Sequence, residues 1–528
     1  MKAFRCPHCG GESQYDPKDG KIICEYCDSV ITVEEYQNET VRRGTFTVNE
    51  LTCSQCGAVI YSTDNTVATF CSYCGSSVLL ESRIVEEKRP NYIIPFKIKQ
   101  EHASGLYRDK IHRILLAPDW MEEEATVEKF RGIYMPYHLF RFTYDGTWEG
   151  EGTNFRIETE NRKKYDVTRT YHVGTSVAVD YKDIPVDASA SFPDGMGRAV
   201  CPYYAKDMVE FKEPYLAGFY ADRADVDPEI YMNKYETLVK MDMSTKKELS
   251  TGGISVPTGE VMEGIELKGE SSSALFPVWF MSHKNKDKIS YAAINGATGE
   301  VVADIPIDFK KYLVAGVIVA GLFSIILNFF IALTPNKLMT ACSILSLIMF
   351  FVANKLYNQT YRRSKHLDDA GYIGKDQDKL RKVKVRKIGS SIAKIVVTTI
   401  AIIFFSSFLM MLSDEFLALY IIISTFLPLI SVGYIVVSVV RTAKGSRGVI
   451  KRKNAPWYYK LLVIGKPLLA MLINLYIAAK HPVEDIYYYV AAIIGIVLLI
   501  LTAFDLVRAQ NKYTMRDLPL FTEKRGGE

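Results

Sequence analysis

Apolar positions change their pattern near residue 312. Before this point charged and turn-forming residues recur along the chain, whereas after it the sequence contains six long apolar runs with at most one charge each. The runs cover residues 312–333, 338–354, 395–413, 416–440, 461–479 and 486–504. A helix needs about 20 residues to cross a hydrocarbon core about 30 Å thick. The pattern therefore predicts an all-α, six-helix transmembrane region over residues 312–507.

The charged segments between these runs indicate how the helices are oriented. Lys and Arg are concentrated after the second run and after the fourth, in residues 362–387 and 441–453, while the other connections are short and weakly charged. Positive residues stay on the cytoplasmic side of a membrane. We therefore expect a multi-pass protein of the cell (inner) membrane with both termini in the cytoplasm and a cytosolic tail over residues 508–528. The basic segments are also suited to contacts with anionic lipid.

Residues 90–308 mix the periodicities of strands and helices. Residues 134–144 alternate as a strand does, and an Asp-Pro pair introduces a helix expected over residues 227–249. A hairpin is expected over residues 289–305, because an Asn-Gly pair and a second glycine supply the positive φ angles of its turn. The pattern predicts a cytosolic mixed α+β domain with an antiparallel sheet.

Eight of the ten cysteines form four Cys-x-x-Cys pairs near the N-terminus. The pairs are Cys6 and Cys9, Cys24 and Cys27, Cys53 and Cys56, and Cys71 and Cys74. In each half, a spacer of 14 residues separates the two pairs. This spacing is typical of a zinc ribbon, in which four thiolates hold one ion in a tetrahedron. We therefore expect two zinc ribbons, over residues 1–40 and 48–82, whose two zinc ions are structural because complete thiolate shells leave no position for water.

The residues beside the thiols favour metal binding over disulfides. Gly10, Gly57 and Gly75 follow their pairs directly, where a knuckle turn requires positive φ, and Asp28 stands at the fourth equivalent position. Eight cysteines would also suit four disulfides in a secreted protein. Residues 1–5 lead into the first pair without an apolar segment, however, so we expect reduced thiols on the cytosolic side. This expectation agrees with the orientation that the basic segments predict.

The sequence offers little support for catalysis. It contains no phosphate loop, no nucleophile elbow and no dinucleotide fingerprint. Its histidines are scattered, and the aromatic residues between 134 and 148 fit the core face of a strand better than a platform for stacking bases. We therefore expect a protein that is not an enzyme.

The ribbon sequences resemble those of bacterial membrane proteins that carry N-terminal zinc ribbons of the general-transcription-factor-B type. The similar segments are residues 6–11, 15–17, 24–27, 92–96, 132–137, 215–220 and 295–302. Some of these proteins resemble partners of phage-shock-type and SPFH-type membrane stress systems, where a zinc-ribbon protein helps to hold peripheral scaffolds at the inner membrane. The resemblance implies eight cysteine ligands and implies no catalytic residue.

These features favour an integral membrane adaptor or scaffold. Its zinc ribbons and α+β domain would meet a cytosolic or membrane-associated protein partner, for example in a membrane stress response, while the lipid bilayer holds its helices. A membrane-tethered nucleic-acid-binding protein is an alternative, but acidic residues such as Glu12, Asp16 and Glu25 interrupt any basic face of the ribbons, so nucleic acid is a disfavoured partner. A transporter is another alternative, because Lys466 and Asp505 lie in or beside apolar runs. The sequence leaves the oligomeric state open.

Overall fold

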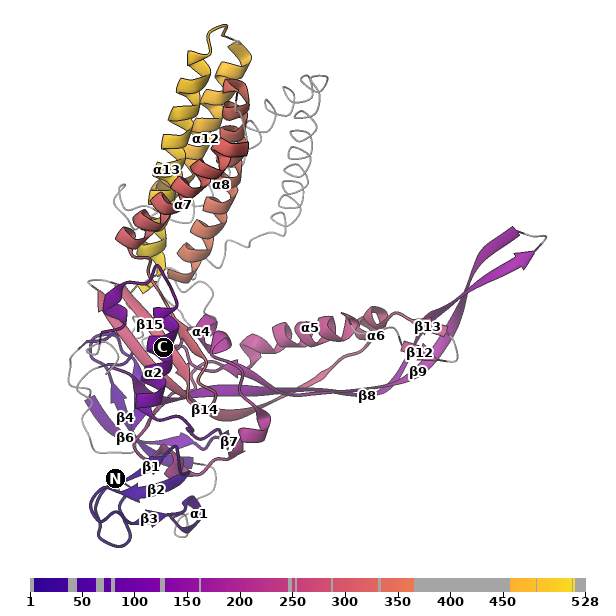
Figure 1. Cartoon of the computed structure of the whole chain (residues 1–528). Helices are drawn as coiled ribbons and strands as arrows, with labels where there is room; N and C mark the ends of the chain where they lie inside the picture. Colours follow the sequence, from indigo (N-terminus) through magenta and orange to yellow (C-terminus); the bar gives the residue numbers. More distant parts are fainter. Residues whose placement is uncertain are drawn as a thin grey trace, which may run out of the picture.

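A computed structural model provides the structure of the chain (Figure 1). It describes residues 4–36, 45–62, 71–76, 81–123, 129–160, 163–245, 249–251, 254–285, 288–330, 334–364, 456–480, 482–514 and 516–517. Three parts are evident: an N-terminal part with the cysteine clusters, a group of long helices above it, and an arm of two strands that extends to one side (Figure 1).

The first ribbon is a small antiparallel sheet of its own. Its strands are β1 (Ser13–Asp16), β2 (Lys21–Cys24) and β3 (Val30–Ile31), followed by the short helix α1 (Val33–Tyr36). Burial alternates along β1, so that Ser13 and Tyr15 face inward. The turn between β1 and β2 ends at Gly20, which has a φ of +65°. The alternation of buried and exposed side chains thus gives this sheet one inner and one outer face, and a sheet of this size is too small to form a core alone.

A sheet of 14 strands in the described residues forms the centre of the N-terminal part. Its main path has the order β10-β7-β14-β8-β11-β5-β4-β6. The strands of this path are β4 (Thr45–Thr52), β5 (Val59–Ser62), β6 (Glu81–Lys88), β7 (Tyr92–Ile93), β8 (Arg131–Glu160), β10 (Val209–Glu210), β11 (Tyr220–Asp222) and β14 (Lys268–Asn285). The others are β9 (Lys163–Asp187), β12 (Leu249–Thr251), β13 (Ile254–Val256), β15 (Lys288–Asn295), β16 (Val301–Ala303) and β17 (Arg516–Asp517).

The sheet is mixed, which corrects the expected antiparallel sheet. Most pairs are antiparallel, but β11 runs parallel to β8, and β14 runs parallel to β7. These two pairs join segments far apart in the sequence, and local alternation does not reveal the direction of such pairing. The second ribbon belongs to this sheet, because β5 pairs with β4 on one side and with β11 on the other.

Both faces of the sheet are covered near the start of β8. Tyr134 lies in one cluster with Phe96 and Phe219, whereas Ile133 and Met135 face a second cluster on the opposite side. Tyr134, Tyr137, Phe140, Phe142 and Trp148 of this strand are therefore core residues, as expected, while Tyr144 is partly buried. The helices near the sheet are α2 (Gln100–His112), α4 (Asp194–Ala199), α5 (Glu229–Thr245) and α6 (Thr258–Gly264), with short 3-10 helices η1 (Asp119–Met121), η2 (Ala205–Asp207) and η3 (Glu213–Leu216).

The hairpin expected over residues 289–305 and the helix expected over residues 227–249 are confirmed. β15 and β16 form the hairpin, and its turn includes Gly299 with a φ of +82°. The buried Asn295 side chain accepts hydrogen bonds from the N–H groups of Ala297 and Thr298 at 2.9 Å each. The expected helix is α5, which begins directly after the Asp-Pro pair. Local turn and cap chemistry determined both elements.

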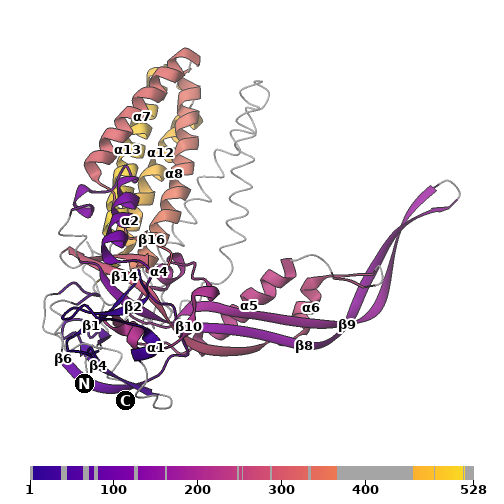
Figure 2. The ribbon, with the colours of Figure 1, turned by 60° about the horizontal axis from the view of Figure 1, so that its bottom comes forward.

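The arm consists of the distal parts of β8 and β9. The two strands pair from Tyr137 with Asp187 out to Glu160 with Lys163, with one irregularity between Phe140 and Phe142. The helices α5 and α6 lie along its proximal half, on the side of the arm that is nearer to the long helices (Figures 1 and 2). Beyond them β13 pairs with β8 at Thr153, and the two long strands then continue to the tip without another described strand (Figure 1).

The long helices correct the expected six-helix transmembrane region. Among the described residues, three helices are long and apolar enough to cross a membrane, over Ala341–Arg362, Lys460–Ile477 and Ile486–Lys512. They lie in α8 (Pro335–Ser364), α12 (Pro456–Lys480) and α13 (Ile486–Thr514), which pack together. Residues 312–330 of the first apolar run lie in α7 (Phe309–Phe330), and the runs over 395–413 and 416–440 lie outside the described residues. The expected number rested on the apolar runs together with the charge of their connections, and among the described residues only three helices meet the length and composition of a membrane span.

Two lysines inside these helices have polar partners. The Lys466 ammonium group and the Asp505 carboxylate form an ion pair between α12 and α13. Lys460 donates a hydrogen bond to the Asn358 side chain at 3.0 Å, which joins α12 to α8. Because charged groups are costly in an apolar setting unless they are paired, these contacts explain how a bundle of this composition tolerates them.

Candidate metal centres

The first cluster brings together the four cysteines of the first ribbon. Cys6 and Cys24 are buried, while Cys9 and Cys27 are exposed. The Sγ atoms of Cys6 and Cys27 lie 3.7 Å apart, those of Cys9 and Cys24 lie 3.5 Å apart, and all four lie within 4.8 Å of one another. A tetrahedral zinc site with Zn–S bonds of about 2.3 Å requires S–S edges of about 3.8 Å. The four thiols therefore fit one metal ion.

The knuckle turns point backbone donors at sulfur. The N–H groups of His8, Gly11 and Tyr26 each donate to a cysteine Sγ at 3.4 Å. Gly10 and Asp28 end their turns with φ of +74° and +54°. The positive φ expected at these positions is confirmed. Such N–H donors stabilise thiolates, which are the form that binds a metal.

A serine adds a further donor that the motif did not predict. The Ser29 hydroxyl lies 3.0 Å from the Sγ of Cys6 and 3.2 Å from that of Cys27. The hydrogen bond between Ser29 and Cys6 is the main reason that the pKa of Cys6 is lowered to about 6. In the sequence, the signal for this hydrogen-bonding group is the serine two positions after Cys27, but rules on the spacing of metal ligands do not consider residues that are not ligands.

The second cluster has the same geometry inside the core. The Sγ atoms of Cys53 and Cys74 lie 3.8 Å apart, and those of Cys56 and Cys71 also lie 3.8 Å apart. All four residues are buried. The knuckle glycines, Gly57 and Gly75, have φ of +73° and +65°. The sequence thus identified all eight cysteines that the structure gathers into two groups able to hold a metal ion.

Equivalent tyrosines reveal the difference between the ribbons. Tyr26 and Tyr73 occupy the same place in their Cys-x-x-Cys pairs, yet Tyr26 is 86% exposed and Tyr73 is 0% exposed. The Tyr73 ring packs against Phe280 with centroids 5.5 Å apart, and the Tyr291 hydroxyl donates to the Tyr73 carbonyl at 3.0 Å. The second ribbon is therefore docked through its knuckle, while the same face of the first ribbon is open.

A buried carboxyl group lies beneath the second knuckle. Burial raises the pKa of Asp222 to about 7, although hydrogen bonds from Ser189 and Tyr73 act in the opposite direction. Asp222 ends β11, the strand that pairs with β5 of the second ribbon. This carboxyl group therefore lies where the ribbon joins the rest of the sheet. Nothing in the local sequence distinguished it from an ordinary turn residue.

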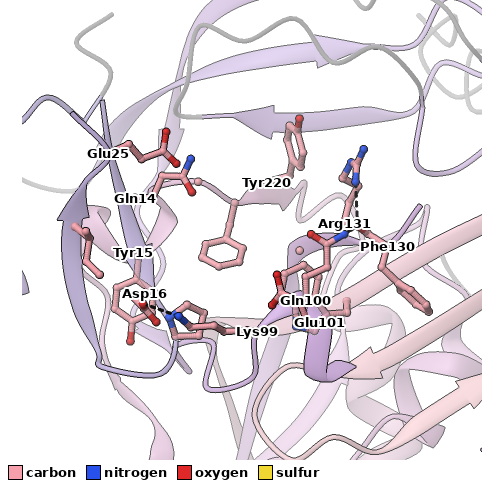
Figure 3. Close-up of a pocket in the computed structure, with 16 residues that line it drawn as sticks. Gln14, Tyr15, Asp16, Glu25, Lys99, Gln100, Glu101, Phe130, Arg131 and Tyr220 are labelled. Atoms are coloured by element: carbon pink, nitrogen blue, oxygen red, sulfur yellow. Dashed lines mark hydrogen bonds and ion pairs between the residues drawn. The ribbon is translucent and has the colours of Figure 1, made fainter. Parts of the chain in front are cut away.

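A pocket of about 360 Å³ separates the first ribbon from the sheet (Figure 3). Tyr15 and Asp16 of β1 line one side, and residues at the start of α2 line the other. Lys99 bridges the two sides through an ion pair with Asp16 at 2.7 Å. The Gln100 side chain donates to the Phe130 carbonyl at 3.1 Å. The pocket contains charges of both signs, and its lining shows no nucleophile paired with a base.

The comparisons with known proteins identify one relative of unknown role. The chain is 28% identical over 315 residues to the uncharacterized protein YdjG of Bacillus subtilis (strain 168), and the match covers 58% of this chain and 91% of the relative. No protein-family profile matches the chain, and no solved structure matches it. The chain is therefore similar to a protein whose printed name gives no function.

Proposed function

We propose that this protein is a membrane-anchored adaptor whose first ribbon binds a protein partner. In this proposal both clusters bind zinc, and both ions are structural because four thiolates complete each shell. Several helices hold the protein in the membrane, with the ribbons and both termini on the cytoplasmic side. The second ribbon stabilises the sheet, and the first supplies the docking face. An adaptor needs no catalytic residue, which is consistent with the absence of a catalytic motif in the sequence.

The contrast between Tyr26 and Tyr73 carries this proposal. A ribbon knuckle with a central tyrosine packs against protein in the second ribbon, where Tyr73 contacts Phe280 and its carbonyl accepts a hydrogen bond from Tyr291. The first ribbon presents the same knuckle with an open tyrosine. Aromatic residues are enriched at the energetic centres of interfaces. The exposed knuckle of the first ribbon therefore suits a protein partner that packs against Tyr26 in the way that the sheet packs against Tyr73 of the second ribbon.

Contacts at the opposite side hold the first ribbon in place. Lys212 forms an ion pair with Glu34 at 2.8 Å, and the Tyr15 N–H donates to the Ala217 carbonyl at 3.2 Å. The ring of Tyr15 also meets that of Tyr215 at 5.4 Å. A ribbon held on one side loses little freedom when a partner binds the other, which favours affinity.

The charge of the knuckle argues for a protein partner over nucleic acid. Glu25 directly precedes Tyr26, Asp28 lies two positions after it, and both acidic residues are exposed. Nucleic-acid binding depends on neutralising phosphates with positive side chains. An exposed aromatic residue between two carboxylates suits a partner with a basic rim around an apolar contact.

Substitution at the open knuckle tests the proposal. Full-length protein carrying Tyr26→Ala is purified from native membranes after crosslinking, beside wild type and the control Tyr204→Ala, whose parent side chain is 49% exposed. We expect Tyr26→Ala to lose a partner that wild type and the control retain, with the zinc content unchanged in all three. Identical partners in the three samples would show that the first knuckle is not a docking face.

A further inference from the structure

The outer edge of β9 lacks a neighbouring strand in the described part of the chain. β9 pairs with β8 along one edge, and its other edge joins no described strand. Residues 170–179 contain no Asp, Glu, Lys, Arg or Pro. Natural proteins protect exposed edges with charges, prolines, bulges or short strands. This long edge has none of these over its central ten residues, so it is suited to pairing with another strand.

The distal arm also exposes large apolar side chains. Phe155 is 63% exposed, Ile157 is 61%, Tyr165 is 47% and Tyr171 is 40%. A two-stranded hairpin is at best marginally stable in water without a third strand or a covering element. The arm extends well beyond α5 and α6 (Figure 1). Its length and its exposed residues therefore indicate a surface that is covered in the functional assembly.

The helix α5 has a matching exposed stripe. Ile230, Leu238 and Met241 are 55%, 42% and 59% exposed, and their spacing places them on one side of the helix. The Tyr181 hydroxyl of β9 donates to Asp242, so this side of α5 faces toward β9. Leu238 stands one turn before Asp242 on the same face. Leu238 therefore lies on the side of α5 that faces β9, whereas Ile230 and Met241 lie further around the helix, toward solvent.

We propose that β9 pairs with β9 of a second copy of this chain, antiparallel and centred on Gly174. A two-fold symmetric contact joins like surfaces and needs no other partner. In this register Tyr171 lies opposite Val177 of the second copy, and Val167 lies opposite its Tyr181. The distal part of the arm of each copy then lies beside the proximal part of the arm of the other copy, which is the part that α5 covers. One interface thus covers the open edge, and it brings Tyr165 and Tyr171 to the face of the shared sheet that carries α5.

The charges along β9 favour pairing centred on Gly174 over pairing centred on Val173. Centred on Gly174, the pairing brings Asp166 to the bulge of β9 that contains Lys182 of the second copy. A centre on Val173 would set Asp166 opposite Asp180, and like charges directly opposite one another are destabilising. A Cβ atom at Gly174 would contact only the Glu149 side chain, at 3.8 Å, so there is space around the proposed two-fold axis at this residue.

The orientation of the arm is compatible with one membrane. The two-fold axis of antiparallel strands in one sheet is perpendicular to that sheet. The arm extends across the direction of the long helices, and α5 covers the face of its sheet on their side (Figures 1 and 2). Rotation about this axis keeps the helices of both copies on the same side of the shared sheet, as a single bilayer requires.

Cysteine crosslinking tests the register in full-length protein in detergent and in native membranes. Residues opposite one another have Cα atoms about 4.5–5.5 Å apart, which suits a disulfide. Gly174→Cys therefore crosslinks to its copy on mild oxidation. The control Ser176→Cys is exposed on the same face, but the two copies of residue 176 are separated by about 13 Å along the strands. It does not crosslink above the wild-type level. Crosslinking of neither variant, or of both equally, would overturn the proposal.

Opposite charges at one position provide a second test. Thr168 lies opposite Asp180 of the second copy, and both side chains are exposed. Thr168→Asp places like charges at two related sites, whereas Thr168→Lys places opposite charges there. The dissociation constant of the dimer, measured by mass photometry on dilution in detergent, is on the order of tenfold higher for Thr168→Asp than for Thr168→Lys. Equal constants, or a monomer throughout, would refute β9 pairing.

Discussion

Replacing Tyr73 by alanine tests whether the second ribbon is part of the core. The side chain is 0% exposed and lies in a cluster with Phe280, Tyr291 and Met135. Removing a fully buried aromatic ring costs about 3–5 kcal/mol of folding free energy. In a domain of about 200 residues this lowers the unfolding temperature by on the order of 10 °C. Thermal unfolding of the full-length protein in detergent, followed by tryptophan emission, measures the shift.

The equivalent tyrosine of the first ribbon is the matched control. Tyr26 has the same place in its knuckle and is exposed, so Tyr26→Ala changes the folding free energy by about 0.5 kcal/mol or less. Trp279 is buried in the same sheet and reports its unfolding. Equal shifts for the two variants, or no shift for Tyr73→Ala, would refute the distinction between a structural ribbon and an open one.

Three further predictions concern metal release, pH and the helix ion pair. A zinc chelator removes metal from the first cluster, with its exposed Cys9 and Cys27, faster than from the buried second cluster, so release measured with a metal-sensitive dye has two phases of one ion each. The pKa of Asp222 is raised to about 7 in the folded protein, so folding favours the neutral carboxyl group, and the contribution of Asp222 to the folding free energy falls as pH rises from about 4 to 7. Asp222→Asn therefore reduces the loss of stability across that range, which unfolding at several pH values measures. Lys466→Leu leaves Asp505 without this partner and lowers the unfolding temperature in detergent, whereas Lys466→Leu combined with Asp505→Leu restores much of it.

Features with local causes were predictable from the sequence. The eight thiols and the turns at Gly10 and Gly57 follow from ligand spacing and backbone conformation within a few residues. The hairpin of β15 and β16 follows from its turn residues in the same way. Each of these features depends on neighbours in the chain, where motif rules apply.

Features that depend on distant contacts were not predictable. The burial of the second ribbon depends on β5 pairing with β11, which sets Tyr61 opposite Ala221. The sequence around Tyr73 resembles that around Tyr26, so it does not show which knuckle is covered. The mixed sheet likewise depends on pairing between distant segments that local alternation does not encode.

A photoreactive amino acid at position 26 measures the proposed docking face most directly. It is incorporated in full-length protein in native membranes and compared with the same residue at position 204, since both parent tyrosines are exposed. We expect position 26 to crosslink to one defined protein that position 204 does not capture, and we expect excess purified partner to compete with the labelled partner. Identical products at the two positions, or none at position 26, would contradict a role for the first ribbon in partner binding.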